Sequence, residues 1–278
     1  MNIHISDNIA LSTKSFSGGE RHLQLHNLPR KLQGTLNVLA YLTSSDDIMD
    51  LLLLQNALNY HYHKEIQLNL ELPYLPYARQ DRVCAVGQAF SMELFAQLLK
   101  NLSIQSLLTW DCHSAVGLRL TAAQNYQMAD IIKHSEDLTA LLKQHNSVVI
   151  CPDKGAVNRC QSLVDSLDLK PMVVCEKIRD PATGRITHTR VVADDLSQKT
   201  AIITDDICDG GYTFIKIAEQ LKQKNAQKVI LYVTHAIFSK GLEVFTGLID
   251  EIYTTQSFKH KPNKKVRVIE VPTSVIIN

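Results

Sequence analysis

The segment ITDDICDGGYT, residues 203–213, brings three carboxylates and two glycines together directly after an apolar run. Asp205 and Asp206 could accept hydrogen bonds from sugar hydroxyls or hold a hydrated magnesium ion. A glycine-rich turn at the start of a predicted helix follows, and the backbone N–H groups of such turns bind anions such as phosphate. The turn consists of Asp209, Gly210, Gly211, Tyr212 and Thr213. We therefore expect a sugar-phosphate cradle; the alternative is an Asp-rich turn that only caps a helix.

Two short segments, WDCHS (residues 110–114) and CPDKG (151–155), each follow an apolar run and carry a possible metal ligand. A neutral imidazole at His113 and a carboxylate at Asp153 can jointly hold a divalent cation that already carries nucleotide phosphates. A lone histidine or aspartate in such a place can also be purely structural. The pairing leads us to expect that both groups hold magnesium on the same face of the molecule.

Two basic segments complete the set. ARQDR, residues 78–82, places two guanidinium groups around a polar pair, and arginine suits planar bases and bidentate phosphate contacts. Lys177 and Arg179 lie in EKIRDPATGR, residues 176–185, which we expect to be a mobile loop. Cations on a closing loop could neutralise charge on a transferring phosphoryl group. The alternative for either segment is a solvated surface loop.

Other phosphate-binding devices are absent from the sequence. It contains no G-x-x-x-x-G-K-[ST] loop, no protein-kinase motif set and no G-x-G-x-x-G segment. If ATP binds to this chain, it binds without those devices.

Composition narrows the class of protein. The formal net charge of +1 over 278 residues argues against a nucleic-acid partner bound through bulk charge. No apolar run approaches the roughly 20 residues of a membrane helix, and the N-terminus does not resemble a secretory signal, so we expect no membrane partner. The six scattered cysteines form no C-x-x-C pair. We interpret them as reduced thiols of a cytoplasmic protein without a zinc site.

Strands alternating with helices of 10–15 residues must position these groups. The pattern predicts strands at residues 35–43, 65–74, 103–111, 147–153, 170–177, 199–206, 225–235 and 251–257. It predicts helices from a cap at Asp46 or Asp47 to Tyr62, from a cap at Ser91 to 102, over 156–167, from Thr213 to 224, and over 239–248. This alternation is typical of an α/β fold with mainly parallel sheets flanked by helices. We expect two such domains, residues 1–130 and 131–278, with ligands beyond the carboxyl ends of the strands.

The motifs, taken together and in order, resemble the ribose-phosphate pyrophosphokinase (phosphoribosyl-pyrophosphate synthetase) family over nearly the whole chain. FSGGE (16–20), PYARQDR (76–82), DCHS (111–114) and CPDKGA (151–156) are similar to its early segment, its ATP-binding motif, its Asp-Leu-His segment and its Ser-Pro-Asp segment. KIR (177–179), DDICDGGYT (205–213) and VTHAIFS (233–239) are similar to its flexible-loop, ribose-phosphate and late Thr-His segments.

The resemblance implies two tandem phosphoribosyltransferase-like domains and a defined reaction. The β,γ-diphosphate of Mg-ATP, the co-substrate, moves to the C1 hydroxyl of ribose 5-phosphate, which releases AMP. The first domain would carry the ATP-binding loop and the second the ribose-phosphate loop. The family usually forms dimers assembled into hexamers, which implies a homo-oligomer here.

The resemblance also implies roles, position by position. Arg79, Gln80, Asp81 and His113 would line the ATP site, with Phe16 and Glu20 of a neighbouring subunit on the adenine. His113 and Asp153 would hold Mg²⁺, and Lys177 and Arg179 would be catalytic, stabilising the transition state. Asp205, Asp206 and Asp209 would face the ribose, and the turn 209–213 would bind its phosphate.

The chain departs from the family at several positions. Gly210 stands where the family has Thr and Tyr212 where it has Gly, which removes a hydroxyl donor and adds an aromatic ring. After RQDR, the family's basic residues become Val83, Ala85 and Gly87, a change that weakens the expectation of regulation by phosphate or ADP.

These departures leave two alternatives to ribose 5-phosphate chemistry open. In one, a larger acceptor such as ADP-ribose is used in NAD salvage, with Tyr212 stacking on a base. In the other, the chain is a non-catalytic regulatory protein that binds partner synthetases.

Overall fold

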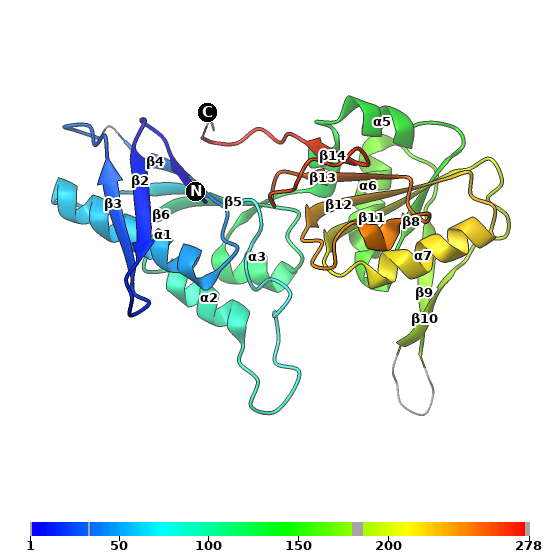
Figure 1. The fold of residues 1–278 in the computed structure, drawn as a ribbon, viewed down its shortest axis with the longest axis horizontal. Helices are drawn as coiled ribbons and strands as arrows, with labels where there is room; N and C mark the ends of the chain where they lie inside the picture. Colours follow the sequence, from blue (N-terminus) through cyan, green and yellow to red (C-terminus); the bar gives the residue numbers. More distant parts are fainter. Residues whose placement is uncertain (1, 33, 180–185, 276–278) are drawn as a thin grey trace. The chain divides into compact units, whose positions relative to one another are not determined.

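The computed structural model describes residues 2–32, 34–179 and 186–275, and side chains at 177–179 and 186–188 lie outside that description. The chain divides into two compact units (Figure 1). The first contains residues up to Tyr126 and the segment that begins at Pro272, and the second contains Gln127–Val271. The boundary predicted from the sequence lies after residue 130, with 272–278 in the second domain.

The first unit is built on a five-stranded sheet of order β1-β4-β5-β6-β7, in which only β1 is antiparallel to its neighbour. Its strands are β1 (Ile3–Ile5), β4 (Leu36–Ala40), β5 (Leu68–Leu72), β6 (Ile104–Trp110) and β7 (Gln124–Tyr126). Its helices are α1 (Ser45–Tyr62), α2 (Ser91–Leu99) and α3 (Ala115–Thr121). All three connect successive parallel strands in one direction, so right-handed crossovers place them on one face of the sheet. Apolar side chains such as Val38, Leu70 and Leu54 fill the interior between them.

A two-stranded hairpin, β2 (Ala10–Ser15) and β3 (Arg21–His26), packs on α1. Arg21 anchors it, because its Nε donates to Asp50 Oδ1 of α1 at 2.9 Å and its second nitrogen pairs with Asp50 Oδ2. The hairpin was not predicted, since its alternating residues are mostly polar and exposed.

The second unit contains a seven-stranded sheet of order β10-β9-β8-β11-β12-β13-β14. Its strands are β8 (Ser147–Cys151), β9 (Val173–Arg179), β10 (Ile186–Val191), β11 (Thr200–Cys208), β12 (Lys228–Ala236), β13 (Glu251–Thr255) and β14 (Val266–Ile269). Its helices are α4 (Met128–Ile132), α5 (Glu136–Leu142), α6 (Val157–Leu167) and α7 (Tyr212–Gln223), with short 3₁₀ turns η1 (Lys154–Ala156) and η2 (Glu243–Phe245). All strand pairs are parallel except β9–β10. The predicted α/β class with mainly parallel sheets is confirmed.

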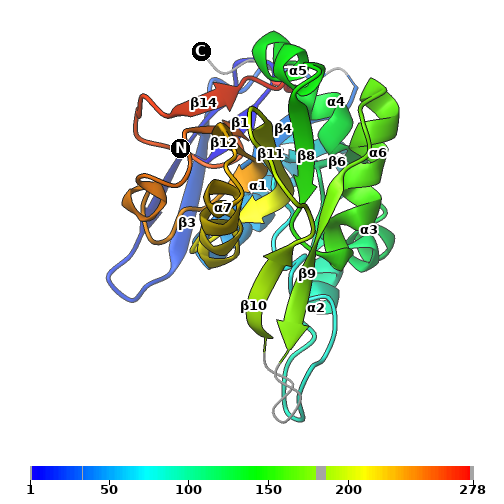
Figure 2. The same ribbon diagram turned by 90° about the vertical axis from the view of Figure 1, so that its right-hand side faces the viewer.

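The strand order reverses direction between β8 and β11. The chain leaves β8 through α6 to β9 on one side, and leaves β11 through α7 to β12 on the other. Right-handed crossovers in opposite directions place α6 and α7 on opposite faces of the sheet, as Figure 2 shows. The buried core of this unit includes Ile203 and Leu231 of the sheet and Ile217 and Leu221 of α7.

Several local predictions are corrected. Helix α1 is capped by Ser44, whose side chain accepts the N–H of Asp47, while Asp47 itself occupies the third helical position of a capping box. Helix α2 starts at Ser91, which is therefore its first residue and not its cap. The helix predicted over 239–248 is only the turn η2, because Gly241 and Gly247 both adopt positive φ angles, which end a helix.

No helix within the described residues is both long enough and apolar enough to cross a membrane.

Candidate functional site

The carboxyl ends of β8 and β11 carry the main group of predicted site residues in the second unit. These strands are neighbours in parallel register, with Ile150 opposite Ile203. Asp153 follows β8 by two residues, whereas Asp205 and Asp206 lie near the end of β11. Ligands of open parallel sheets bind where the strand order reverses, which is the place these residues occupy. The structure therefore brings Asp153 and the 205–213 segment to one edge of this sheet.

Asp205 and Asp206 share one cation, Arg159 of α6. The Arg159 guanidinium lies 3.4 Å from Asp205 Oδ1 and 3.2 Å from Asp206 Oδ2. Asp205 Oδ1 also accepts the N–H of Asp206 at 2.9 Å. Burial, followed by the neighbouring Asp206, holds the pKa of the Asp205 carboxyl well above its usual range. Arg159 partly neutralises the charge of this pair and fixes its position, which suits it to accept hydrogen bonds from hydroxyl groups.

The turn after β11 depends on Gly211. This residue has a φ of +80° and immediately precedes α7, so it contributes no capping side chain. A Cβ added there would lie 2.6 Å from the Phe245 ring. Gly210 differs, because an added Cβ would meet nothing closer than Lys240 Cγ at 3.5 Å. The first turn of α7 therefore lacks a side-chain cap, which suits its N–H groups to an anion.

Tyr212 and Thr213 begin α7 beside this turn. The Tyr212 side chain is 68% exposed, and Lys216 Nζ lies 5.9 Å from the centre of its ring. Thr213 is half-buried. The Asp209 carbonyl accepts the N–H of Ser239 at 3.2 Å, so the segment after β12 packs against the turn.

Asp153 has a structural role besides any functional one. It is the N-cap of η1, and its Oδ1 accepts the N–H groups of Gly155 at 2.7 Å and Ala156 at 3.2 Å. The capping bonds fix the orientation of the carboxylate at the sheet edge.

In the first unit, the predicted ATP-site segments meet. Ser114 Oγ donates to Asp81 Oδ2 at 2.7 Å, which ties the ARQDR loop to the segment after β6. Ser114 also caps α3 through the N–H groups of Val116 and Gly117. His113 is exposed directly before this cap, and Arg79 and Gln80 are exposed beside Asp81. The structure therefore groups Arg79, Gln80, Asp81 and His113 on one part of this unit.

Phe16 and Glu20 lie at the tip of the β2–β3 hairpin and are exposed. Phe16 N–H donates to the Glu20 carbonyl at 2.9 Å, and Lys14 Nζ lies 4.9 Å from the centre of the Phe16 ring. The residue is 51% exposed, an unusual state for a phenylalanine.

Lys177 and Arg179 lie in β9, paired with Thr189 and Ile186 of the antiparallel strand β10, and not on the predicted loop. The apolar and β-branched residues of both segments favour strands here. The side chains of both cations lie outside the described part of the chain, as do residues 180–185 between the two strands.

Two polar residues close to these groups, Arg159 and Lys240, were not predicted from the sequence. Arg159 has no local signal, because its partners lie 46 and 47 positions away and only the sheet topology brings them close. Lys240 lies on the segment that was expected to be a helix. Among the described residues, no group of three or more His, Cys, Asp or Glu side chains could hold a metal ion. Magnesium in nucleotide sites needs only one or two protein carboxylates besides phosphates and water, so the chemistry of Asp153 fits this ion.

Comparisons with known proteins agree with this architecture. Residues 122–262 match the family model described as phosphoribosyl transferase domain. Residues 6–102 match the model described as the N-terminal domain of ribose phosphate pyrophosphokinase.

Individual relatives cover most of the chain. A ribose-phosphate pyrophosphokinase of Shewanella oneidensis is 29% identical over 94% of this chain and 83% of its own length. Another, from Pyrococcus furiosus, is 26% identical over 92% of this chain and 88% of its own length. The crystal structure of phosphoribosylpyrophosphate synthetase from Mycobacterium smegmatis superposes with a TM-score of 0.76 at 24% identity, covering 94% of this chain and 86% of that one. This last likeness concerns the fold.

Proposed function

Because the chain belongs to the ribose-phosphate pyrophosphokinase family, we propose that it transfers the β,γ-diphosphate of ATP to the C1 hydroxyl of ribose 5-phosphate. The products are phosphoribosyl pyrophosphate and AMP. The family assignment made from the sequence motifs is confirmed by the two family models. The observation that carries the proposed reaction is the edge of the second sheet, where paired acids and a turn without a side-chain cap follow β11 at the point of strand reversal.

The second unit would bind the acceptor. Asp205 and Asp206 accept the ribose hydroxyls while Arg159 holds both carboxylates in place. Asp209 also faces the ribose, and the backbone N–H groups of the 210–213 turn hold the 5′-phosphate. Lys240 adds a cation there, because its side chain lies against Gly210, where the family has a threonine.

The first unit would bind ATP. Arg79, Gln80 and Asp81 contact the nucleotide, and the bond from Ser114 to Asp81 keeps that loop beside His113. Phe16 and Glu20 of a second copy hold the adenine, which makes the enzyme a homo-oligomer, a dimer or a hexamer. The exposed Phe16 ring supports this assignment, since a neighbouring subunit or a base would cover it.

Mg²⁺ would be held by His113 and Asp153, and when bound it neutralises charge on the ATP phosphates. The C1 hydroxyl oxygen of ribose forms a bond to the β-phosphorus and its proton passes to solvent, while the bond from that phosphorus to the α-β bridging oxygen breaks and AMP leaves with that oxygen. Lys177 and Arg179 stabilise the charge of the transferring group. Little covalent work falls to the protein, so its contribution is positioning and charge neutralisation.

The test is to incubate the purified protein with ATP, magnesium and ribose 5-phosphate. We expect AMP to appear one-for-one with phosphoribosyl pyrophosphate, and ribose without the phosphate to be a much poorer acceptor. Absence of AMP with every ribose phosphate tried would refute the proposal. Turnover by the purified chain alone would also exclude the non-catalytic regulatory alternative.

ADP-ribose is the second candidate acceptor, and two observations favour it. Tyr212 exposes 68% of its side chain beside the turn, and Gly210 leaves room where the family has a larger residue. The exposed ring could stack on the adenine of a larger 5′ group, which would serve NAD salvage. Equal enzyme assayed with each acceptor decides: a strong preference for ribose 5-phosphate excludes this candidate.

We place the enzyme in the cytoplasm, with neither nucleic acid nor membrane as a partner. None of the six cysteines, all of which lie within the described residues, forms a disulfide, as expected in a reducing compartment.

A further inference from the structure

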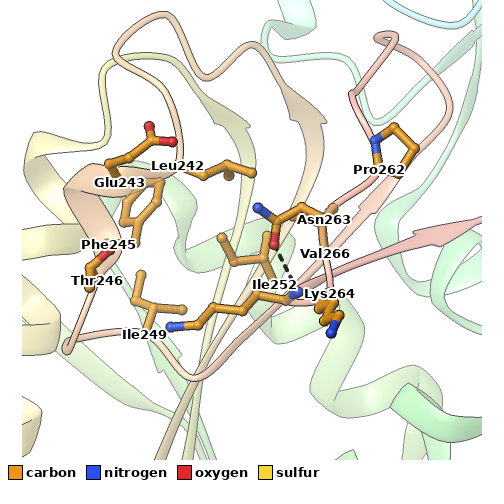
Figure 3. Close-up of a pocket in the computed structure, with 11 residues that line it drawn as sticks. Leu242, Glu243, Phe245, Thr246, Ile249, Ile252, Pro262, Asn263, Lys264 and Val266 are labelled. Atoms are coloured by element: carbon orange, nitrogen blue, oxygen red, sulfur yellow. Dashed lines mark hydrogen bonds between the residues drawn. The ribbon is translucent and has the colours of Figure 1, made fainter.

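A cavity of about 450 Å³ lies in the second unit, outside the proposed substrate site. It opens between the η2 segment and the connection from β13 to β14, and Figure 3 shows the side chains that line it. Its apolar lining comes from Phe245, Ile249, Ile252 and Val266. A concave apolar surface of this size with a few polar groups is typical of small-molecule sites.

The polar part of the lining includes two adjacent lysines. Lys264 and Lys265 line the cavity, and the backbone between them is fixed because Asn263 Oδ1 accepts the N–H of Lys265 at 2.9 Å. Glu243 is the one acidic residue of the lining, but its carboxylate points away from the cavity in Figure 3. It folds instead toward Gly241, where an added Cβ would lie 2.5 Å from Glu243 Oε2. Two exposed lysines in the lining of a cavity with an apolar floor complement a ligand that combines an apolar body with an anionic group.

Phe245 joins this cavity to the proposed sugar-phosphate turn. It lines the cavity, and its ring also lies against Gly211, so closely that a single Cβ there would overlap it. The ring is nearly fully buried and also packs edge-on to Phe238, with ring centres 5.9 Å apart. A ligand that restrains or shifts Phe245 therefore acts directly on Gly211, the residue that immediately precedes α7.

We propose that this cavity binds an organic anion with an aromatic or apolar body and that its occupation is transmitted through Phe245 to the turn 209–213. Binding of an anion in this cavity does not depend on the proposed function. An effect of that binding on ribose 5-phosphate rests on the proposed function.

The first experiment measures binding with 1-anilinonaphthalene-8-sulfonate, a fluorescent aromatic anion, and with N-phenyl-1-naphthylamine, its neutral analogue. The variant Lys264→Gln/Lys265→Gln should bind the anion at least about tenfold more weakly, since two charge-assisted contacts are lost, and the neutral dye unchanged. Thr246→Trp, which fills the cavity from an exposed lining position, should weaken both dyes. The control Lys31→Gln/Lys64→Gln removes equal charge from exposed lysines of the first unit and should change neither. Equal binding of the anion by all four proteins would overturn the proposal.

The second experiment measures backbone hydrogen exchange over residues 209–213 with and without the anionic dye. In the wild type, saturating dye should change the exchange rate of this segment severalfold, and in Lys264→Gln/Lys265→Gln the same dye concentration should change it far less. An unchanged rate in the wild type with the cavity occupied would overturn the transmission. Neither readout needs turnover, so failure of the proposed reaction would leave both results interpretable.

Discussion

Lys240 belongs to no predicted motif, and its proposed role follows from its contact with Gly210. Its side chain lies against Gly210, at 3.5 Å from where a Cβ would stand, and it is exposed to solvent. If it holds the acceptor phosphate, Lys240→Ala should raise the KM for ribose 5-phosphate about tenfold, a loss of roughly 1.4 kcal/mol, with kcat changed less than about twofold. Lys240→Arg keeps the charge and should restore most of the affinity. Steady-state kinetics of AMP release measure both, and an unchanged KM in the alanine variant would contradict the assignment.

Replacing Asp205 is expected to raise the stability of the protein and to weaken acceptor binding. Its pKa is raised by burial and by Asp206, so the folded state favours the protonated acid. The stabilising effect of that proton is complete below the ordinary pKa near 3.8 and is lost as the pH rises through the raised value. At pH 7 the unfolded chain has released this proton, whereas the folded chain must either keep it or hold a poorly solvated charge, and Asp205→Asn removes that cost.

We expect Asp205→Asn to raise stability at pH 7 by about 1 kcal/mol or more, about 2–4 °C in Tm for a chain of this size, while acceptor binding falls. Thermal melts at pH 7 and pH 4 measure the effect, and the gain should shrink at the acidic pH. A gain of equal size at both pH values would show that charge is not its cause.

The acids and the turn after β11 could be predicted from the sequence, but the residues that contact them could not. A run of Asp and Gly after an apolar strand is a local signal, and the 205–213 segment was predicted from it. Arg159 and Phe245 act on that segment from far along the chain. Their roles depend on which strands are neighbours and on side-chain packing, and neither is encoded in local periodicity.

At the scale of elements, the β11–α7 turn contains two adjacent glycines, of which Gly210 has room for a Cβ and Gly211 does not. Gly211→Ala introduces a Cβ at a φ of +80° and within 2.6 Å of Phe245, so it should destabilise the second unit by about 1–3 kcal/mol and impair acceptor binding. Gly210→Ala is the matched control, because its Cβ would meet only ordinary contact distances. Thermal melts and the KM for ribose 5-phosphate compare the two. Equal effects of both substitutions would argue that the turn rearranges freely.

The elements that were predicted correctly are those whose burial follows a regular period. The central strands β4, β5, β8, β11 and β12 are buried over nearly their whole length, and α6 and α7 bury one face each. The segment 239–248 has helix-like apolar spacing, but its glycines at 241 and 247 take left-handed angles and leave only η2. The short helices α3, α4 and α5 were missed, because five to seven residues carry too little periodicity to identify them.

At the scale of the whole molecule, the proposed metal ligands come from different units, His113 from the first and Asp153 from the second. If both hold one ion, His113→Ala and Asp153→Asn should each raise the magnesium concentration for half-maximal rate. The double variant should raise it by less than the product of the single effects. Asparagine keeps an oxygen that can cap η1, so the second substitution tests charge rather than folding.

AMP release as a function of magnesium measures all three variants, with His61→Ala, an exposed histidine in the last turn of α1, as the control. Effects that multiply in the double variant would indicate two independent roles.

The chain returns to its first unit after completing the second. Ser274 donates its N–H to Glu71 Oε2 at 2.7 Å, and Trp110 Nε1 donates to the other oxygen of the same carboxylate at 3.0 Å. Glu71 is only 2% exposed, so losing one of these donors should cost about 1–3 kcal/mol. In connectivity the second unit is an insertion between Tyr126 and Pro272. Anyone who separates the halves for study must therefore graft residues 272–275 onto the N-terminal piece, since a single cut would leave a buried acid short of a hydrogen-bond donor.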